Sequence, residues 1–234
     1  MISSGPPNFS APPIVPSYVP AYAPPPDKSP VLVFAVVGLA IILVAALIAG
    51  AVVLVYYKGQ GKPKAVSVTE EKKPLTFGDG TRYEGGVSDG KPDGHGIMIF
   101  PNGDIYDGEF SGGKRNGDGT FTFHEGIKYT GQFKNDLYNG HGTMTFPNGN
   151  VYDGGFQDGR YDGQAVFTFN DGAKYTGQFK NDAYNGHGTM KFANGDVYEG
   201  EFRDGKYNGQ GTFAFHDGRR QEGFWADGKL VAPP

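Results

Sequence analysis

Cysteine is absent from the 234 residues of the chain. Its absence excludes disulfide bonds, thiolate catalysis and zinc sites built on cysteine. An excess of basic charge is also lacking: the formal net charge is −4, which gives no overall signal for nucleic-acid binding. Glycine, in contrast, is abundant at 39 residues, as are phenylalanine at 18 and tyrosine at 14. This composition favours closely approaching backbones covered by packed rings.

Residues 1–30 form a proline-rich tail that holds ten of the 17 prolines. Because proline lacks an amide donor and the stretch shows no hydrophobic periodicity, we expect the tail to be extended and largely disordered. Its segment APPIVPSYVPAYAPPP could dock in a groove for polyproline II helices, but a solvated spacer is the favoured interpretation. Asn8 begins a glycosylation sequon, which predicts a glycan there if this end is lumenal or extracellular.

Val31–Tyr57 is an uncharged apolar run of 27 residues. As a helix it would be about 40 Å long, enough to cross a hydrocarbon core of about 30 Å with some tilt. The run is too long and begins too late for a signal peptide, and it lacks the polar face of a soluble helix. We therefore predict one transmembrane α-helix over residues 31–57.

Residues 58–74 form a charged linker after this helix. Lys58, Lys62 and Lys64 follow the apolar run directly, whereas only Lys28 precedes it. The positive-inside rule therefore predicts an N-terminus outside the cell or in a lumen and a cytosolic C-terminal part, in a membrane that the sequence does not identify. The same three lysines are predicted contacts for anionic lipid headgroups, at about 1 kcal/mol for each basic residue near the surface.

From Tyr83 onward the chain repeats with a period of 23 residues, in six full units with partial units at both ends of residues 75–234. A tyrosine opens each full unit, a glycine lies two residues later, and an apolar residue lies two residues after that. The structural positions are Tyr83, Gly85, Tyr106, Gly108, Tyr129, Gly131, Tyr152, Gly154, Tyr175, Gly177, Tyr198, Gly200 and, in the last partial unit, Trp225.

One unit, Tyr129–Phe146, shows what each repeat builds. Two runs with alternating apolar and polar residues are joined by a connection rich in glycine, asparagine and aspartate, which predicts a β-hairpin. Asn-Gly and Asp-Gly pairs between units predict tight turns. The sequence therefore predicts an all-β fold, an elongated single-layer ribbon of stacked hairpins in which aromatic rings lie over glycine backbone.

The ribbon has two edges. A short strand at Leu75–Phe77 follows Pro74 and charged residues, which discourage pairing with another chain. At the other edge we expect Trp225 to cover the last ring and Val231–Pro234 to add no strand. Two open edges also allow a homodimer.

This pattern resembles the MORN (membrane occupation and recognition nexus) family, whose motif Y-x-G-x-x-x-x-G-x-x-x-G-x-G-x-x-x-x-x-x-G matches Tyr198–Gly218. Local departures from the motif are Asp136 and Asp182 at a mid-loop glycine, and Ala165 at the second glycine of the G-x-G pair. The resemblance implies a binding role of the kind found in scaffolds of membrane contact sites and of the cytoskeleton.

Histidines are the candidates for chemistry, because His141 and His187 each lie between two glycines. The same position holds His95 in the first unit and Asp118, Gln164 and Gln210 in the other three, and a metal site needs several converging donors, so we interpret it as structural. The remaining histidines, at turns, are interpreted in the same way. We predict no catalytic residue, no metal and no cofactor.

We therefore expect no enzyme but a single-pass membrane-anchored scaffold that presents a cytosolic β-ribbon to an unknown protein partner or tethers a membrane or the cytoskeleton. The alternative is a phospholipid-binding module for membrane contact or recognition. Residues 75–230 contain 15 Lys and Arg against 22 Asp and Glu, and this net charge of −7 opposes direct binding of the array to anionic lipid. Residues 119–164 and 165–210 share 32 of 46 positions, which indicates tandem duplication of a two-repeat unit.

Overall fold

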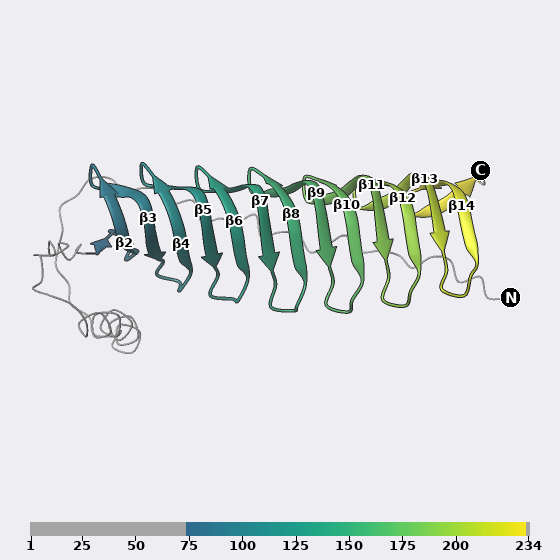
Figure 1. Ribbon diagram of the computed structural model, residues 1–234, viewed down its shortest axis with the longest axis horizontal. Coiled ribbons are helices and arrows are strands. Elements are labelled where there is room, and N and C mark those ends of the chain that lie inside the picture. The colour runs from purple at the N-terminus through teal and green to yellow at the C-terminus, as the bar shows by residue number, and fades with distance from the viewer. Residues whose placement is uncertain (1–73, 233–234) are drawn as a thin grey trace, which may run out of the picture. The chain divides into compact units, whose positions relative to one another are not determined.

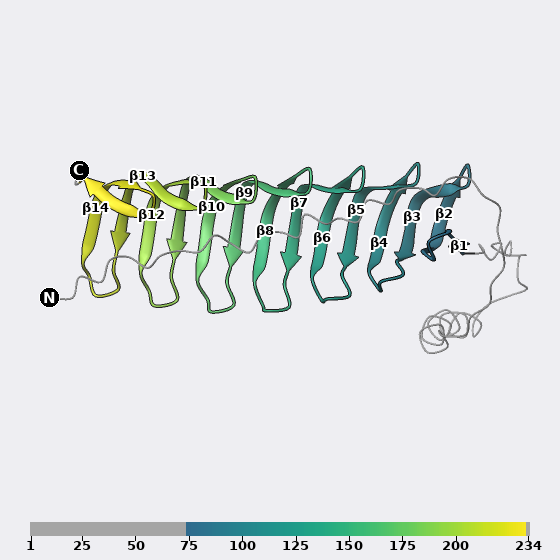
Figure 2. The same ribbon diagram turned by 180° about the vertical axis from the view of Figure 1, so that it is seen from behind.

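The computed structural model describes residues 74–232. These residues form one antiparallel sheet of 15 strands that lie side by side in chain order, with no helix (Figures 1 and 2). The predicted all-β ribbon of stacked hairpins is thus confirmed for this part of the chain. The predicted tail (1–30), transmembrane helix (31–57) and linker up to residue 73 lie outside the described residues.

The strands follow the 23-residue period, with two strands in each unit. They are β1 (Leu75–Thr76), β2 (Arg82–Ser88), β3 (Lys91–Ile99), β4 (Ile105–Ser111), β5 (Lys114–Thr122), β6 (Lys128–Lys134), β7 (Leu137–Thr145), β8 (Val151–Gln157), β9 (Arg160–Thr168), β10 (Lys174–Lys180), β11 (Ala183–Lys191), β12 (Val197–Arg203), β13 (Lys206–Ala214), β14 (Arg220–Ala226) and β15 (Lys229–Ala232).

Each of the six hairpins from β2–β3 to β12–β13 pairs a seven-residue strand with a nine-residue strand, and the extra residues form a bulge. In β6 and β7, Gly131 lies opposite Gly142 and Phe133 lies opposite Tyr138, so the register shifts between the two pairs. Gly140 takes up the extra length at φ 69°, a left-handed conformation that glycine adopts without strain. A bulge bends its strand, and the strands are visibly curved at one end in both views (Figures 1 and 2).

The hairpin turns are tied to one another along the sheet. Between β6 and β7, Asn135 and Asp136 have φ values of 49° and 72°, and the backbone N–H of Asp136 donates to the carbonyl oxygen of Arg115 in the preceding unit. Gly159 makes the corresponding hydrogen bond to Tyr138, one unit later. Asp136 therefore departs from the glycine of the motif without changing the turn or its link to the neighbouring hairpin.

Tyrosine and phenylalanine side chains form the core on one side of the sheet. We call the side that carries Tyr129, Gly131 and Phe133 the aromatic face, and the opposite side the polar face. The Tyr129 ring, which is fully buried, makes edge contacts with Phe133 and Phe156 at centroid distances of 5.1 and 5.0 Å. Each such pair contributes about 0.5–1.5 kcal/mol beyond the burial of its area. Equivalent contacts recur in later units, so the core runs along the sheet as a continuous stack.

Facing glycines make room for these rings. The Tyr129 ring lies over Gly131 on its own strand and over Gly142 on the next, and its hydroxyl donates to the carbonyl oxygen of Gln132 at 2.8 Å. A Cβ at Gly131 would lie 2.5 Å from the Cα of Gly142 and 2.6 Å from the Tyr129 oxygen. The same register position is glycine on β2 to β14, with Ala165 on β9 as the exception.

The C-terminal edge corrects the prediction that Val231–Pro234 adds no strand. Residues Lys229–Ala232 form β15, which pairs with β14. The physical reason is the turn: Asp227 and Gly228, at φ 48° and 81°, reverse the chain with the left-handed conformations that close the other hairpins. Trp225 covers the last tyrosine that opens a repeat, since its ring lies 5.4 Å from that of Tyr198 and its indole N–H donates to the carbonyl oxygen of Gly211 at 2.9 Å.

Residues 74–232 contain no helix that is long and apolar enough to cross a bilayer.

Replacing Gly131 by valine should destabilise the array by about 1–3 kcal/mol, because the branched side chain overpacks the contact between two backbones and a ring. His141→Ala is the matched control, since the His141 side chain is 73% exposed on the polar face. The urea midpoint of each variant measures the effect. Equal losses for the two substitutions would contradict this account of the glycine.

Candidate binding surfaces

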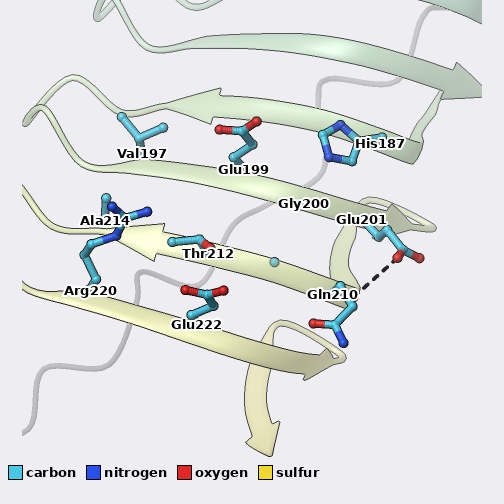
Figure 3. A pocket seen from close by; sticks show the side chains of 11 residues that line it. His187, Val197, Glu199, Gly200, Glu201, Gln210, Thr212, Ala214, Arg220 and Glu222 are labelled. Atoms are coloured by element: carbon cyan, nitrogen blue, oxygen red, sulfur yellow. Dashed lines mark hydrogen bonds between the residues drawn. The ribbon is translucent and has the colours of Figure 1, made fainter. Parts of the chain in front are cut away.

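The polar face carries a shallow hollow of about 440 Å³ near the C-terminal end of the sheet, across β11 to β14. Glu199, Thr212 and Glu222 lie in a row across three neighbouring strands, as Figure 3 shows. His187 and Gln210 lie to one side of this row, toward one end of their strands, as Figure 3 shows. The rest of the lining is Val197, Gly200, Glu201, Gly211, Ala214 and Arg220. Strands rather than loops hold these side chains, so their spacing is fixed by the sheet.

Carboxylates dominate the hollow. Glu199, Glu201 and Glu222 face one arginine, Arg220, and one histidine, His187. Glu201 accepts a hydrogen bond from the backbone N–H of Gln210 at 3.4 Å, drawn as the dashed line in Figure 3. An open acidic surface of this kind can attract the cationic side chains of a partner, but it lacks the enclosure that a small-molecule site requires.

Histidines on the polar face pair with carboxylates on the next strand. His95 Nε2 lies 3.2 Å from Asp107 Oδ1, and His141 Nε2 lies 3.4 Å from Asp153 Oδ1. All four side chains are more than half exposed, so each pair contributes little to stability. Within residues 74–232, no group of three or more His, Asp or Glu side chains is placed to hold a metal ion.

Histidines at the turns between units have a different role, which the sequence did not indicate. The buried carboxylate of Asp104 accepts hydrogen bonds from the backbone N–H of His124 at 2.9 Å and from its ring at 3.0 Å. Asp196 and His216 repeat the arrangement at 2.8 and 2.7 Å. Each aspartate thereby ties its own turn to the turn of the following unit, 20 residues along the chain.

These hydrogen bonds set the charge state of the two aspartates. Burial alone would raise the pKa of the Asp104 carboxyl, but hydrogen bonds from the backbone and ring of His124 and from Asn102 outweigh it and hold the pKa below its usual range. The pKa of Asp196 is lowered for the same reasons, by His216 and Asn194. Both groups therefore stabilise the fold as carboxylates.

The turns explain the 46-residue alternation that the sequence indicates. Asp104, Asn150 and Asp196 recur at that interval, and Asn150 also accepts from the next turn, through the N–H of Asn170 at 2.9 Å. The intervening units hold Ile127 and Ala173 at this position, which cannot accept. Turns that supply a side-chain acceptor alternate with turns whose backbone N–H donates to that acceptor. Two repeats therefore form one structural unit.

A buried ion pair interrupts the aromatic stack at one unit. Arg115 occupies the position that Tyr138 and Tyr161 hold in the next two units, with its side chain 1% exposed. Its Nε lies 3.2 Å from Asp136 Oδ1, and its guanidinium carbon lies 5.1 Å from the centre of the Phe121 ring. Burial lowers the pKa of the guanidinium while Asp136 opposes the shift, and arginine remains charged at neutral pH. The sequence signal for this pair was Arg115 in a position that tyrosine holds in the four following units.

The structure separates the residues that the sequence singled out. The repeat tyrosines, their glycines and Trp225 lie together on the aromatic face, where packing uses them. The histidines divide between the polar face and the turns. The lysines expected to contact lipid, Lys58, Lys62 and Lys64, and the predicted glycosylation site Asn8 lie outside the described residues.

Comparison with known proteins identifies the repeat. The family profile of the MORN repeat matches residues 83–105, 106–128, 129–151, 152–174, 175–197 and 198–219. No curated protein sequence matches the chain.

Solved structures that match the chain include the TCP domain of SAS-4 (dCPAP) from Drosophila melanogaster, in complex with a proline-rich motif of Ana2 (dSTIL). That domain is 11% identical, with a TM-score of 0.37, and the match covers 71% of this chain and 86% of the domain. A mutant TCP10 domain of CPAP from Danio rerio is 17% identical, with a TM-score of 0.28 and coverage of 65% and 82%. At these identities and TM-scores the likeness supports no statement about function.

Asp136→Gly should cost about 3–5 kcal/mol of unfolding free energy, because it leaves the Arg115 guanidinium buried without its carboxylate. Arg115→Tyr should cost less, since Asp182 already lies beside a tyrosine and accepts from the N–H of Tyr161 at 2.8 Å. The double variant recreates the Tyr138 and Gly159 combination and should unfold near the wild-type urea midpoint. A loss from Asp136→Gly no larger than that from Arg115→Tyr would count against the ion pair.

Acid should weaken the array through Asp104 and Asp196. Their pKa values are lowered by folding, so the stability they contribute is present above the unfolded value of about 3.9 and is lost as pH falls through the folded value. Asp104→Asn with Asp196→Asn keeps an acceptor at both turns, as Asn150 does, and removes the titration. The urea midpoint of this variant should fall less between neutral and acidic pH than that of wild type; parallel curves would exclude the two carboxylates as the cause.

Proposed function

The chain belongs to the MORN-repeat family, and from this premise we propose that it is a non-catalytic scaffold held at a membrane by one transmembrane helix. The proposal rests on the difference between the two faces of the sheet. The side chains of the aromatic face are buried in the core, whereas the polar face presents equivalent strand positions at every second strand, about 9.6 Å apart. Such a surface suits an elongated protein partner better than a small ligand.

The partner surface that fits best is cationic. The hollow lined by Glu199, Glu201 and Glu222 lies on the polar face, and residues 75–230 carry a net charge of −7. Complementary charge accelerates encounter and favours the correct register of a partner. A partner that carries basic side chains along an extended surface would therefore bind along the polar face of the sheet.

We propose that the chain is not an enzyme because its candidate groups are periodic. The polar-face histidines recur as pairs with carboxylates, and the turn carboxylates recur as hydrogen-bond acceptors. Catalysis needs an asymmetric set of groups that converge on one reacting atom. A repeat position that is used several times along a sheet does not supply that asymmetry.

The membrane part of the proposal rests on the sequence. Val31–Tyr57 carries no charge over 27 residues, and Lys58, Lys62 and Lys64 follow it. We propose that these lysines lie at the cytosolic headgroups, with the repeat array in the cytosol and the N-terminus outside or in a lumen. They also favour phospholipid binding as a second function, confined to the linker because the charge of the array opposes it.

Proximity labelling of the full chain tests this function. A labelling enzyme fused after Pro234 should mark cytosolic proteins, and one fused before Met1 should mark lumenal or extracellular proteins. Glu199→Lys should reduce the cytosolic labelling several-fold, because it reverses a charge in the hollow. Glu125→Lys is the matched control, since this side chain is 72% exposed at a turn away from the hollow.

Lumenal labelling from the fusion after Pro234 would overturn the orientation. Cytosolic labelling that Glu199→Lys leaves unchanged would show that the polar hollow does not recruit the partner.

A further inference from the structure

The polar face is apolar at one place, near the N-terminal end of the described sheet. Ile97 and Ile99 lie two residues apart on β3, and Ile105 lies opposite Ile99 on β4. These residues are 41%, 42% and 39% exposed and lie on the side of the sheet opposite the buried rings. We call them the isoleucine patch. Contiguous apolar side chains exposed on a surface commonly mark an interaction site.

The isoleucine patch is a departure from the repeat. Ile97–Ile99 has the sequence I-M-I, whereas the same positions have T-F-T at Thr120–Thr122 and T-M-T at Thr143–Thr145. No later full unit has isoleucine at any of the three positions of the patch. The threonines of β7 pair with the neighbouring strands in the same register as the isoleucines of β3 do. The fold therefore does not require isoleucine at these positions.

Charged side chains surround the isoleucine patch unevenly. Glu84 on β2 and Asp107 on β4 both lie opposite Ile97, so this end of the patch has a carboxylate on each side. At the other end of the patch, Arg82 lies opposite Ile99. Complementary charge fixes the orientation in which a ligand binds. The patch therefore suits a ligand that places a basic group at the Ile97 end and apolar groups at the other end.

We propose that the isoleucine patch binds a short segment of a partner protein in which two apolar side chains stand next to an arginine or lysine. The apolar side chains pack on Ile99 and Ile105. The stem of the basic side chain lies on Ile97, and its charge lies between Glu84 and Asp107. An anionic membrane surface is a poorer occupant, because these carboxylates repel it.

This site is separate from the acidic hollow. The hollow lies across β11 to β14, whereas the isoleucine patch lies on β3 and β4, toward the other end of the same sheet (Figure 1). The two surfaces also differ in chemistry, because the hollow offers carboxylates alone and the patch combines them with apolar contact. Binding at the patch therefore does not depend on recruitment of a partner to the hollow.

A peptide array probed with the full chain in phosphatidylcholine nanodiscs tests the proposal. Its peptides place arginine, lysine, glutamate or serine next to two apolar residues, and wild type should bind the arginine and lysine peptides most strongly. Ile97→Thr with Ile99→Thr should lower this binding about ten-fold, because apolar contact area is lost. The variant should fold, since it copies the sequence of Thr143–Thr145. Thr143→Ser with Thr145→Ser is the matched control and should leave binding unchanged.

Glu84→Thr tests the charge, and it gives β2 the residue that β6 has at this position. It should reduce the preference for arginine and lysine peptides over serine peptides several-fold, because one of the two carboxylates beside Ile97 is removed. An array on which no basic peptide binds better than its serine counterpart would overturn the proposal. So would peptide binding that Ile97→Thr with Ile99→Thr leaves at the wild-type level.

Alkylation of a single thiol distinguishes the possible occupants of the patch. Because the chain has no cysteine, Ile105→Cys supplies one thiol at the patch, and Val151→Cys supplies one at the equivalent position of β8 as the control. Slower alkylation of Ile105→Cys only when a selected arginine peptide is added supports the proposal. Protection in nanodiscs without peptide would assign the patch to the bilayer, and protection that grows with the concentration of the chain alone would assign it to a second copy. Either result contradicts the proposal.

Discussion

In five of the six full repeats the ring of the opening tyrosine lies over two glycines, one on its own strand and one on the next, and this contact constrains the rest of the sheet. Gly131 and Gly142 face each other so closely that neither has room for a side chain beneath the Tyr129 ring. A side chain at either glycine would collide with the ring, so this register of the two strands is the one that accommodates it. With the register fixed, the phenylalanine rings meet the tyrosine at its edge, and one layer of strands acquires a buried core.

Much of this architecture could be predicted from the sequence, because the contacts that define it are local. The hairpin of Tyr129–Phe146, the turns and the glycine positions all involve residues within one repeat, where alternation and turn residues are visible. The sequence did not reveal the Asp104–His124 and Arg115–Asp136 contacts, which join residues 20 and 21 positions apart in neighbouring units. Nothing in the period shows that those turns lie side by side. The expectation of no strand at Val231–Pro234 also missed β15, which the turn at Asp227 and Gly228 brings against β14.

The polar hollow could not be predicted for a related reason. Its carboxylates, Glu199 and Glu222, are one repeat apart and ordinary for exposed strand positions. Only the flat packing of β12 to β14 brings them into one row. The 46-residue alternation, in contrast, was visible in the sequence as duplication, and the structure gives it a cause. An acceptor at Asp104, Asn150 or Asp196 has a use only if the following turn offers an N–H, so the two kinds of turn are maintained as a pair.

The direction of the strands has a mechanical consequence. The hydrogen bonds between antiparallel strands run perpendicular to the strands, and therefore along the row in which the 15 strands follow one another. A pull between the two ends of the sheet loads these bonds in series, so the weakest hairpin opens first while the others stay closed. One 23-residue repeat occupies about 9.6 Å of the folded row and about 80 Å when drawn out. An array under tension would thus lengthen one repeat at a time and behave as an extensible strap rather than a rigid rod.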